Sequence, residues 1–261
     1  AHIISIMSSI ITRSPVLITG GAGFIGANIV NRLLDLGYKN VNLIVKESTD
    51  LTRLKNVIKK INLHKADLLD KDLEKIINKV NPSIIIHLAT YSQYRNQQAV
   101  LPMIDTNIKA TLNLLNSTRN LNYDVFINTG SSSEYGIKKR PMKESDLLEP
   151  ISFYAATKAS ATLLCQVFAK EFQKPIVTLR PFSVYGPYEE KKRFIPTIIK
   201  AVIEEKTIKL TPGDQRRDFI YIDDVIDIYI NAILKGKKLA GQVLNMGTGI
   251  EYTNDQVVQA L

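Results

Sequence analysis

The chain has 261 residues, of which 34 are lysine or arginine and 25 are aspartate or glutamate, so its formal net charge is +9. A hydrophobic share of 45% and a charged share of 23% are ordinary for a globular protein and exclude intrinsic disorder and collagen-like repeats. The single cysteine excludes an internal disulfide, and the sequence has no Cys/His cluster of the zinc-binding kind. We therefore expect a reducing, cytoplasmic location and no metal.

The excess of positive charge is compatible with nucleic acid, a membrane surface or a phosphate-bearing small molecule. The basic clusters are short and scattered and are not interleaved with aromatic residues, which argues against nucleic acid. Apolar stretches stay well below the ~18–20 residues that span a bilayer, which argues against a membrane helix. We expect most of the lysines to be solvated.

Residues 1–14 form an apolar leader that contains five isoleucines. No lysine or arginine precedes the apolar part, as a secretory signal would require. We interpret the leader as disordered or as foreign to the native chain.

Beyond Pro15, short apolar runs alternate with amphipathic stretches, the pattern of βαβ units in a parallel sheet. The expected strands are Val16 to Thr19, Val41 to Val45, Ile61 to His64, Ser83 to Leu88, Val125 to Thr129 and Ile176 to Leu179. The expected helices are Phe24 to Leu36, Lys71 to Val80, Met103 to Arg119 and Tyr154 to Phe172. The predicted fold is α/β, a doubly wound parallel sheet of the Rossmann type with a small C-terminal substrate lobe. We predict a dinucleotide-binding domain over residues 15–180 and the lobe over 181–261, with about 218–246 returning to the main domain.

A glycine-rich turn lies between the first strand and the first helix, with the sequence GGAGFIG over residues 20–26. It satisfies both the GxGxxG and the GxxGxxG spacing. Such glycines let the chain turn sharply, approach a pyrophosphate and pack the helix closely on the strand, while the helix N-terminus attracts the phosphates. This predicts a dinucleotide site, in which the cofactor-binding residues are Gly20, Gly23, Phe24, Ile25 and Gly26.

The end of the second strand bears on the choice of cofactor. An acid at this place would bind a free ribose 2′-hydroxyl, but the chain has Lys46, which favours the 2′-phosphate of NADP. If Lys46 is merely exposed and Glu47 or Ser48 holds the hydroxyl, the cofactor is NAD. After the third strand, Asp67 and its neighbour Leu68 are candidates for the adenine end.

Three further side chains form a candidate catalytic set. Tyr154 and Lys158 are four residues apart at the start of a helix and therefore share one face. An ammonium beside a phenol lowers the pKa of the phenol from its ordinary ~10, which suits a general acid or base at a carbinol or carbonyl centre. Ser131 follows the strand that ends at Thr129, at the carboxyl edge where ligands bind, and it can hold a substrate oxygen beside the tyrosine.

These motifs together resemble the nucleotide-sugar epimerase/dehydratase group of the extended short-chain dehydrogenases/reductases. The resemblance runs from about Val16 to the end of the chain. The motifs that carry it are TGGAGFIG (19–26), HLAT (87–90), Asn107, GSSSEYG (130–136), YAATK (154–158), LRPFSVYGP (179–187) and DQRRDFIYIDDV (214–225).

The resemblance implies an NAD(P)-dependent enzyme that acts on a nucleotide diphosphate sugar. Tyr154 would be the acid/base, Lys158 would hold the nicotinamide ribose, and Ser131 would bind the reacting sugar oxygen. The other cofactor-binding residues that it implies are Leu88, Ala89, Asn107 and Pro181. Ser132, Ser133, Tyr154 and Arg217 would bind substrate, and Arg180 would belong to the half that faces the nucleotide sugar. For Arg217, a surface ion pair with Asp214 or Asp218 is the alternative.

The family runs 4-epimerisation, 4,6-dehydration and 4-keto reduction on this frame. In the dehydratases that it resembles, an acid follows the serine or threonine of the motif, whereas this chain has Ser132 and Ser133 there. Glu134 comes one place later and points away if the turn is strand-like. With dehydration disfavoured, we expect a reductase of a 4-keto-6-deoxy sugar, because GSSSEYG and Lys46 favour it. A 4-epimerase with tightly bound NAD is the alternative, and a non-catalytic dinucleotide-binding scaffold is a further one.

Two expectations concern assembly and length. The resemblance implies a homodimer formed through the helices expected over Met103 to Arg119 and Tyr154 to Phe172. Their apolar residues could equally be core, namely Leu112, Leu115, Leu163, Leu164 and Phe168. Family members commonly exceed 300 residues, so the substrate lobe is expected to be truncated.

Overall fold

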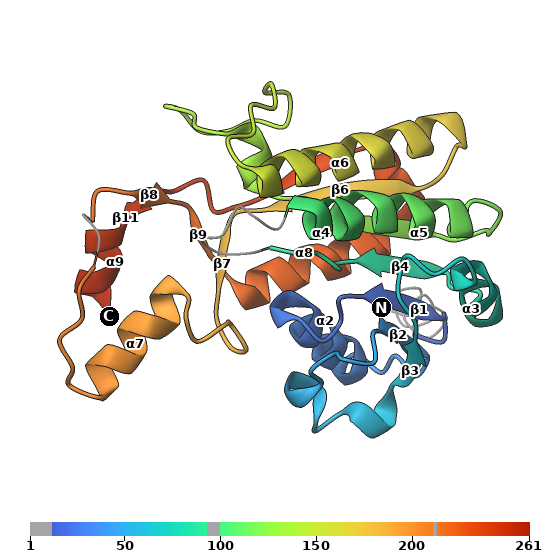
Figure 1. Cartoon of the computed structure of the whole chain (residues 1–261), viewed down its shortest axis with the longest axis horizontal. Helices are drawn as coiled ribbons and strands as arrows, with labels where there is room; N and C mark the ends of the chain where they lie inside the picture. Colours follow the sequence, from blue (N-terminus) through green and yellow to red (C-terminus); the bar gives the residue numbers. More distant parts are fainter. Residues whose placement is uncertain (1–11, 93–99, 211–212) are drawn as a thin grey trace, which may run out of the picture.

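The computed structural model describes residues 12–92, 100–210 and 213–261. The leader predicted over residues 1–14 therefore lies almost wholly outside the described residues. Element labels follow Figure 1.

The centre of the molecule is a seven-stranded sheet in the order β10-β6-β5-β4-β1-β2-β3, in which every neighbouring pair is parallel. Its strands are β1 (Val16–Thr19), β2 (Val41–Val45), β3 (Asn62–Lys65), β4 (Ile84–His87), β5 (Val125–Thr129), β6 (Ile176–Pro181) and β10 (Val243–Met246). The strand order reverses between β1 and β4, which is the point where open α/β sheets bind ligands. The predicted doubly wound fold is confirmed.

Helices cover both faces of this sheet (Figure 1). The first group packs in one core with the strands and consists of α2 (Phe24–Asp35) and α8 (Ile222–Lys235). The second group packs on the opposite face and consists of α3 (Leu73–Val80), α5 (Ala110–Thr118) and α6 (Phe153–Glu171).

The inner strands are mostly apolar, and β1 and β4 almost entirely so, because both of their faces are covered. In β1, Val16 and Ile18 belong to the core under α2 and α8, whereas Leu17 between them belongs to the core under α3, α5 and α6. Successive side chains of a strand point to opposite faces, so an alternating polar pattern would bury polar groups on one side.

A smaller lobe stands at one end of the sheet, on the left of Figure 1. It contains α7 (Phe194–Ile203) and α9 (Asn254–Ala260) together with two-stranded sheets. The parallel pair is β7 (Ser183–Tyr185) with β9 (Phe219–Tyr221), and the antiparallel pair is β8 (Arg216–Arg217) with β11 (Tyr252–Thr253). Between these parts the chain runs through α8 and β10, which lie with the main sheet. The division into domains at residue 180 stays a prediction.

The helix expected over Met103 to Arg119 is not uniform. It begins with α4 (Val100–Ile104), continues through a π-helical segment labelled η3 (Asp105–Lys109), and ends with α5. Such wide turns commonly mark functional sites. Here the wide turn contains the buried Asn107.

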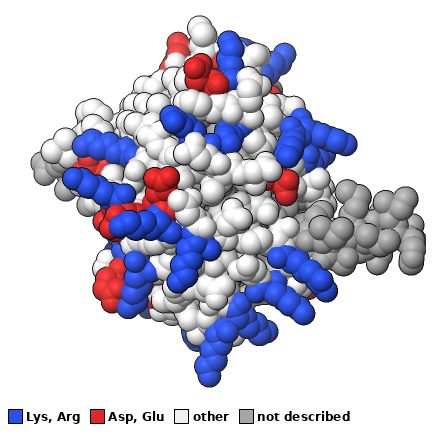
Figure 2. All heavy atoms as spheres, turned by 90° about the vertical axis from the view of Figure 1, so that its right-hand side faces the viewer, with Lys and Arg blue, Asp and Glu red and all other residues white. Residues whose placement is uncertain are grey.

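The described helices include none that is long and apolar enough to cross a membrane. On the face drawn in Figure 2, lysine and arginine side chains are spread around the surface with acidic groups among them rather than gathered into one stripe.

Candidate active site

The glycine-rich turn between β1 and α2 lies against the loop that follows β4. Gly20 has a φ of +71°, and a Cβ built there would stand 2.6 Å from the backbone nitrogen of Ala89. A Cβ at Gly26 would stand 2.3 Å from the carbonyl oxygen of Gly20. Only glycine fits either position, and the close packing brings Leu88 and Ala89 to the switch point of the sheet. Their contact with a cofactor stays a prediction.

The N-terminus of α2 is open to an anion. Gly23 is the N-cap, and it has no side chain that could bond the N–H groups of the first turn. Phe24 and Ile25 supply two of these N–H groups. Gly23 itself is exposed. A pyrophosphate binds where no side chain blocks its approach to the backbone and where free N–H groups lie at the positive end of a helix. These residues therefore fit a dinucleotide, whose pyrophosphate they would hold.

Lys46 is not a free cation at the end of β2. Its ammonium lies 2.7 Å from a carboxylate oxygen of Asp67, and both side chains are partly exposed. The same carboxylate accepts a bond from the backbone N–H of Leu69, and the bonds from Lys46 and Leu69 help to hold the pKa of Asp67 below its ordinary value against the opposing effect of burial. Leu68 is buried beside it. The structure thus brings Lys46 and Asp67 together, but each is already the ion-pair partner of the other.

Asn107 pins the loop after β4. Its Oδ1 accepts from the Thr90 hydroxyl at 3.1 Å and from the Tyr91 N–H at 2.7 Å. Its Nδ2 donates to the Tyr91 carbonyl and to the hydroxyl of Thr157 on α6. The amide of this predicted cofactor ligand is therefore engaged by protein, and its effect on a cofactor would pass through the loop that it holds.

His87 of the HLAT motif is a buried neutral group. The Thr111 hydroxyl donates to the Asn107 carbonyl, so it accepts from His87 Nε2, and the Thr19 hydroxyl donates to Nδ1. Burial, with the nearby charge of Lys158, lowers the pKa of His87 to about 3. The ring therefore links β1, β4 and α5 and is no acid or base near neutral pH.

Ser131 begins a tight turn at the carboxyl end of β5. Its hydroxyl bonds the Ser133 hydroxyl at 2.7 Å and accepts from the Ser133 N–H, and it caps the short helix η4 (Ser132–Tyr135). The three serines are partly exposed. The turn thus presents hydroxyls at the edge where ligands of parallel sheets bind.

Tyr154 and Lys158 lie on α6 opposite this turn. Burial raises the pKa of Tyr154, while its hydrogen bonds with the hydroxyls of Ser131 and Thr90 oppose the rise. Lys158 is buried and donates to the Thr129 carbonyl, and burial lowers its pKa to about 8. The structure therefore brings Ser131, Tyr154 and Lys158 together at one place, as the sequence predicts.

The burial of Lys158 has a measurable cost. We expect Lys158→Met to raise the free energy of unfolding near pH 7 by about 1–3 kcal/mol, since one pKa unit corresponds to ~1.4 kcal/mol. Between the folded pKa of about 8 and the ordinary value of 10.5 the unfolded chain binds the extra proton, so the wild type gains stability as pH rises. The difference between the two proteins should therefore shrink toward pH ~10 in urea titrations. A variant that is less stable than wild type near pH 7 contradicts this.

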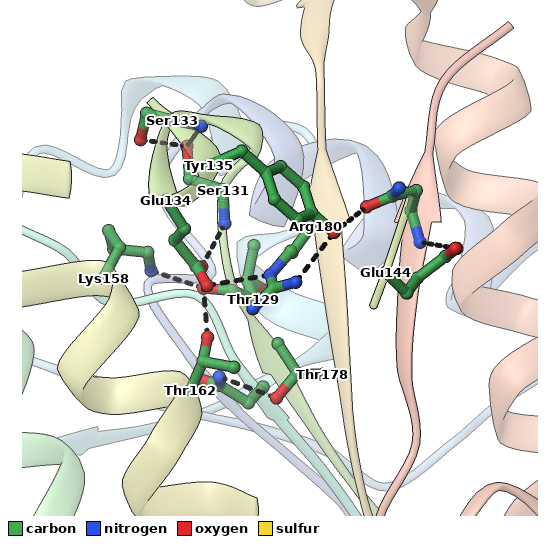
Figure 3. Close-up of polar contacts among 12 residues, drawn as sticks. Thr129, Ser131, Ser133, Glu134, Tyr135, Glu144, Lys158, Thr162, Thr178 and Arg180 are labelled. Carbon is green, nitrogen blue, oxygen red and sulfur yellow. Dashed lines mark hydrogen bonds and ion pairs between the residues drawn. The ribbon is translucent and has the colours of Figure 1, made fainter. Parts of the chain in front are cut away.

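Arg180 is buried and paired within the protein, whereas the resemblance places it in the half that faces the nucleotide sugar. The side chain is 3% exposed, and its Nε lies 2.8 Å from the carboxylate of Glu134, which is fully buried (Figure 3). The turn that carries Glu134 is a 3-10 helix rather than strand-like, so the carboxylate points into the protein. The LRPFSVYGP motif that contains Arg180 gives no sign of such a partner 46 residues away.

Arg217 is exposed on β8 and donates to the carbonyl of Arg216. Among the described residues no ion pair with Asp214 or Asp218 forms, and Asp218 instead accepts from Thr248 and Gly249. Arg217 is thus available to a ligand. Pro181 ends β6 beside Met246 of β10, at the edge predicted for the cofactor.

The lobe contains a cavity of about 550 Å³ that sequence reasoning did not anticipate. Its lining includes Tyr185, Glu189, Ile195 and Tyr221. The Oε2 atom of Glu189 is buried and has no hydrogen-bond partner among the described residues, and burial raises the pKa of this carboxyl to about 7.

The sheet is fully parallel and doubly wound, with a glycine turn at its switch point and a Ser–Tyr–Lys set at its carboxyl edge. These features are typical of the short-chain dehydrogenase class of dinucleotide-binding proteins. The chain belongs to the NAD dependent epimerase/dehydratase family, which it matches over residues 16–247.

Relatives of this chain include nucleotide-sugar enzymes of two kinds. The chain is 31% identical to a dTDP-D-glucose 4,6-dehydratase of Dictyostelium discoideum over 94% of its own length, and it spans 61% of that protein. It is 34% identical to the uncharacterized UDP-glucose epimerase YtcB of Bacillus subtilis, over 89% of this chain and 76% of that one. The solved UDP-glucuronic acid 4-epimerase of Bacillus cereus, in complex with UDP-glucuronic acid and NAD, is 31% identical with a TM-score of 0.84, over 94% of this chain and 81% of that one.

Proposed function

We propose that this protein catalyses oxidoreduction at C4 of a nucleotide-linked sugar, with Tyr154 as the proton-transferring group. The observation that carries the proposal is the meeting of Ser131, Tyr154 and Lys158 at the carboxyl edge of the sheet, beside a turn that fits a dinucleotide. A scaffold without catalysis would not need a tyrosine and a buried lysine in this arrangement.

The chain's own residues supply binding, orientation and proton transfer. When bound, the nicotinamide of the cofactor would supply or accept a hydride at the sugar carbon. Ser131 holds the oxygen on that carbon, and Tyr154 gives a proton to it or takes one from it. Lys158, whose pKa is about 8, keeps positive charge beside the cofactor ribose and stabilises the phenolate of Tyr154. Arg217 is the exposed group that can grip the diphosphate through two oxygens.

A 4,6-dehydratase is the least suited of the family's reactions. The positions after Ser131 carry the hydroxyls of Ser132 and Ser133, so no carboxylate is present there. The nearest acid, Glu134, is bound to Arg180 and cannot handle a substrate proton. The likeness to the Dictyostelium dehydratase therefore supports the family rather than the reaction.

Reduction of a 4-keto-6-deoxy sugar is the reaction that we propose, because Lys46 stands where an acid would select NAD. Epimerisation at C4 is the second candidate. It is favoured by the likeness to the NAD-bound 4-epimerase of Bacillus cereus and by the ion pair that occupies Lys46.

One pair of assays separates the two reactions. In the first, the purified protein receives a 4-keto-6-deoxy nucleotide sugar and NADPH, and loss of absorbance at the nicotinamide band is followed. In the second, it receives UDP-glucose or UDP-glucuronic acid alone, and the C4 epimers are separated. Consumption of NADPH supports the reductase, whereas epimer formation with no NADPH loss assigns the epimerase. If neither reaction occurs with any of these sugars, the proposed function is contradicted.

We propose NADP as the preferred cofactor, with Lys46 and the 2′-phosphate as the deciding contact. Lys46→Asp should shift the ratio of affinities for NADPH and NADH toward NADH by about ten-fold or more, because it places a like charge beside the phosphate. Titration of protein with each dinucleotide measures the ratio. Lys65→Asp, which removes the neighbouring ammonium paired with Glu47, is the matched control and should leave the ratio within about two-fold. An unchanged ratio in Lys46→Asp assigns NAD instead.

We also propose a homodimer that forms through the outer faces of α5 and α6, which lie side by side (Figure 1). Leu115 and Phe168 of the predicted set belong to the core, but Leu112 and Leu163 are 37% and 53% exposed, and Val167 beside them is 61% exposed. Leu163→Glu should convert the dimer to a monomer, because it places a charge in the apolar interface. Sedimentation of both proteins at the same protein concentration measures this. A monomeric wild type, or a variant that stays dimeric, contradicts this surface.

A further inference from the structure

Glu134 is a fully buried carboxylate that the proposed chemistry does not use. It accepts hydrogen bonds from three separate segments of the chain (Figure 3). The Ser131 N–H reaches its Oε1 at 2.8 Å, the Thr162 hydroxyl reaches the same oxygen at 3.1 Å, and Arg180 Nε reaches its Oε2 at 2.8 Å. One side chain therefore joins the serine turn, helix α6 and strand β6.

The close fit around this carboxylate fixes its place. A Cβ at Gly130 would stand 2.6 Å from the Oε1 atom, so a larger residue there would have to displace the carboxylate. Arg180 neutralises the charge and is itself buried. Because a buried charge that loses its partner is strongly unfavourable, the carboxylate and the guanidinium hold each other in one geometry.

The bond to Thr162 reaches the catalytic face of α6. Thr162 is one helical turn beyond Lys158 and two beyond Tyr154, so the three side chains share that face. The bond to Ser131 reaches the other half of the site. Glu134 therefore spans the gap between the serine that would hold the substrate oxygen and the helix face that carries the tyrosine and the lysine.

We propose that Glu134 is a positioning residue that sets the place of Ser131 relative to Tyr154 and Lys158, with Arg180 as its fixed counter-ion. This inference rests on the proposed function of the same site. Arg180 extends the connection, since its Nη1 donates to the Tyr135 hydroxyl, which donates to Asn245 on β10. The serine turn is thereby also anchored to the last strand of the sheet.

The charge of Glu134 acts on the same two groups. It raises the pKa of Tyr154 and opposes the lowering of the pKa of Lys158 by burial. Among the described residues, other charged or titratable groups around them include Arg180 on β6, His87 on β4, Cys165 on α6 and Tyr135 in η4. Replacing Glu134 by a neutral residue should therefore lower the pKa of both Tyr154 and Lys158.

The test uses two variants and a matched control. Glu134→Gln removes the charge and turns an amide N–H toward Arg180, and Thr162→Val removes only the bond to α6. The control is Thr118→Val, which removes an equally buried hydroxyl that donates to the Leu114 carbonyl in α5, outside the site. Turnover, KM for the dinucleotide and the pH at which Tyr154 ionises are measured for each. The ionisation of Tyr154 is obtained as the absorbance difference between each protein and its Tyr154→Phe counterpart.

We expect kcat to fall by about ten-fold or more in Glu134→Gln and by about three-fold in Thr162→Val, with KM for the dinucleotide within about two-fold. Tyr154 should ionise at lower pH in Glu134→Gln than in the wild type, and Thr118→Val should match the wild type throughout. Wild-type kcat in both variants with an unshifted Tyr154 ionisation overturns the inference. If Glu134→Gln does not fold, a wild-type kcat in Thr162→Val is by itself sufficient to overturn the inference. A wild type without turnover refutes the proposed function, while the Tyr154 ionisation still decides the role of Glu134.

Discussion

Tyr154→Phe is expected to lower turnover by about 10³-fold while leaving dinucleotide affinity within about two-fold of wild type. The reason is that the substitution removes only the phenolic oxygen that transfers the proton. The ring keeps its packing on α6, and the glycine turn that fits the pyrophosphate is untouched. Steady-state kinetics on the active substrate and fluorescence titration with the reduced dinucleotide give the two quantities.

Tyr123→Phe is the control for this prediction. Tyr123 is 2% exposed and bonds Thr118, and it precedes β5, at the end of that strand away from Ser131. It should lose stability without the loss of turnover seen at Tyr154. Equal activity of Tyr154→Phe and wild type would remove the tyrosine from the chemistry and leave a dinucleotide-binding scaffold as the better description.

Gly26→Ala is expected to abolish measurable dinucleotide binding and to lower the free energy of unfolding by about 2–3 kcal/mol. The added methyl would stand 2.3 Å from the Gly20 carbonyl oxygen and 2.7 Å from the Gly21 Cα, so α2 must move away from the turn. That movement displaces the N–H groups at the start of the helix from the place of the pyrophosphate. Denaturant unfolding and dinucleotide titration measure the two effects.

Gly37→Ala separates binding from stability. Gly37 follows the same helix and has a φ of +88°, but a Cβ there meets nothing within 4 Å. The substitution should cost about 1 kcal/mol through backbone strain and leave dinucleotide affinity unchanged. If Gly26→Ala binds the dinucleotide as the wild type does, the site does not lie at this turn.

The parts of the fold and site that the sequence predicts are those with a local signal. The strands of the sheet are short apolar runs because both faces are covered, and the turn at residues 20–26 shows its glycines at the spacing that the packing requires. Tyr154 and Lys158 are predicted because a helix places positions four apart on one face.

The parts that the sequence does not predict depend on pairs far apart in the chain. From the sequence, Lys46 is predicted to be a free cation that binds a phosphate. In the structure it forms an ion pair with Asp67, because β2 and β3 are neighbours in the sheet. Arg180 reads as a substrate ligand, and only the pairing of β5 with β6 brings Glu134 to it. The wide turn around Asn107 likewise has no signature in the apolar pattern of the helix.

The most direct test of the central claim follows the hydride itself. NADPH or NADH that carries deuterium at the reactive nicotinamide carbon is incubated with the protein and a 4-keto nucleotide sugar, and the product is analysed by NMR. We predict deuterium at C4 of the sugar with the wild type and none with Tyr154→Phe. Deuterium that stays on the cofactor with the wild type, or that reaches the sugar equally fast in Tyr154→Phe, would contradict a tyrosine-dependent oxidoreduction at C4.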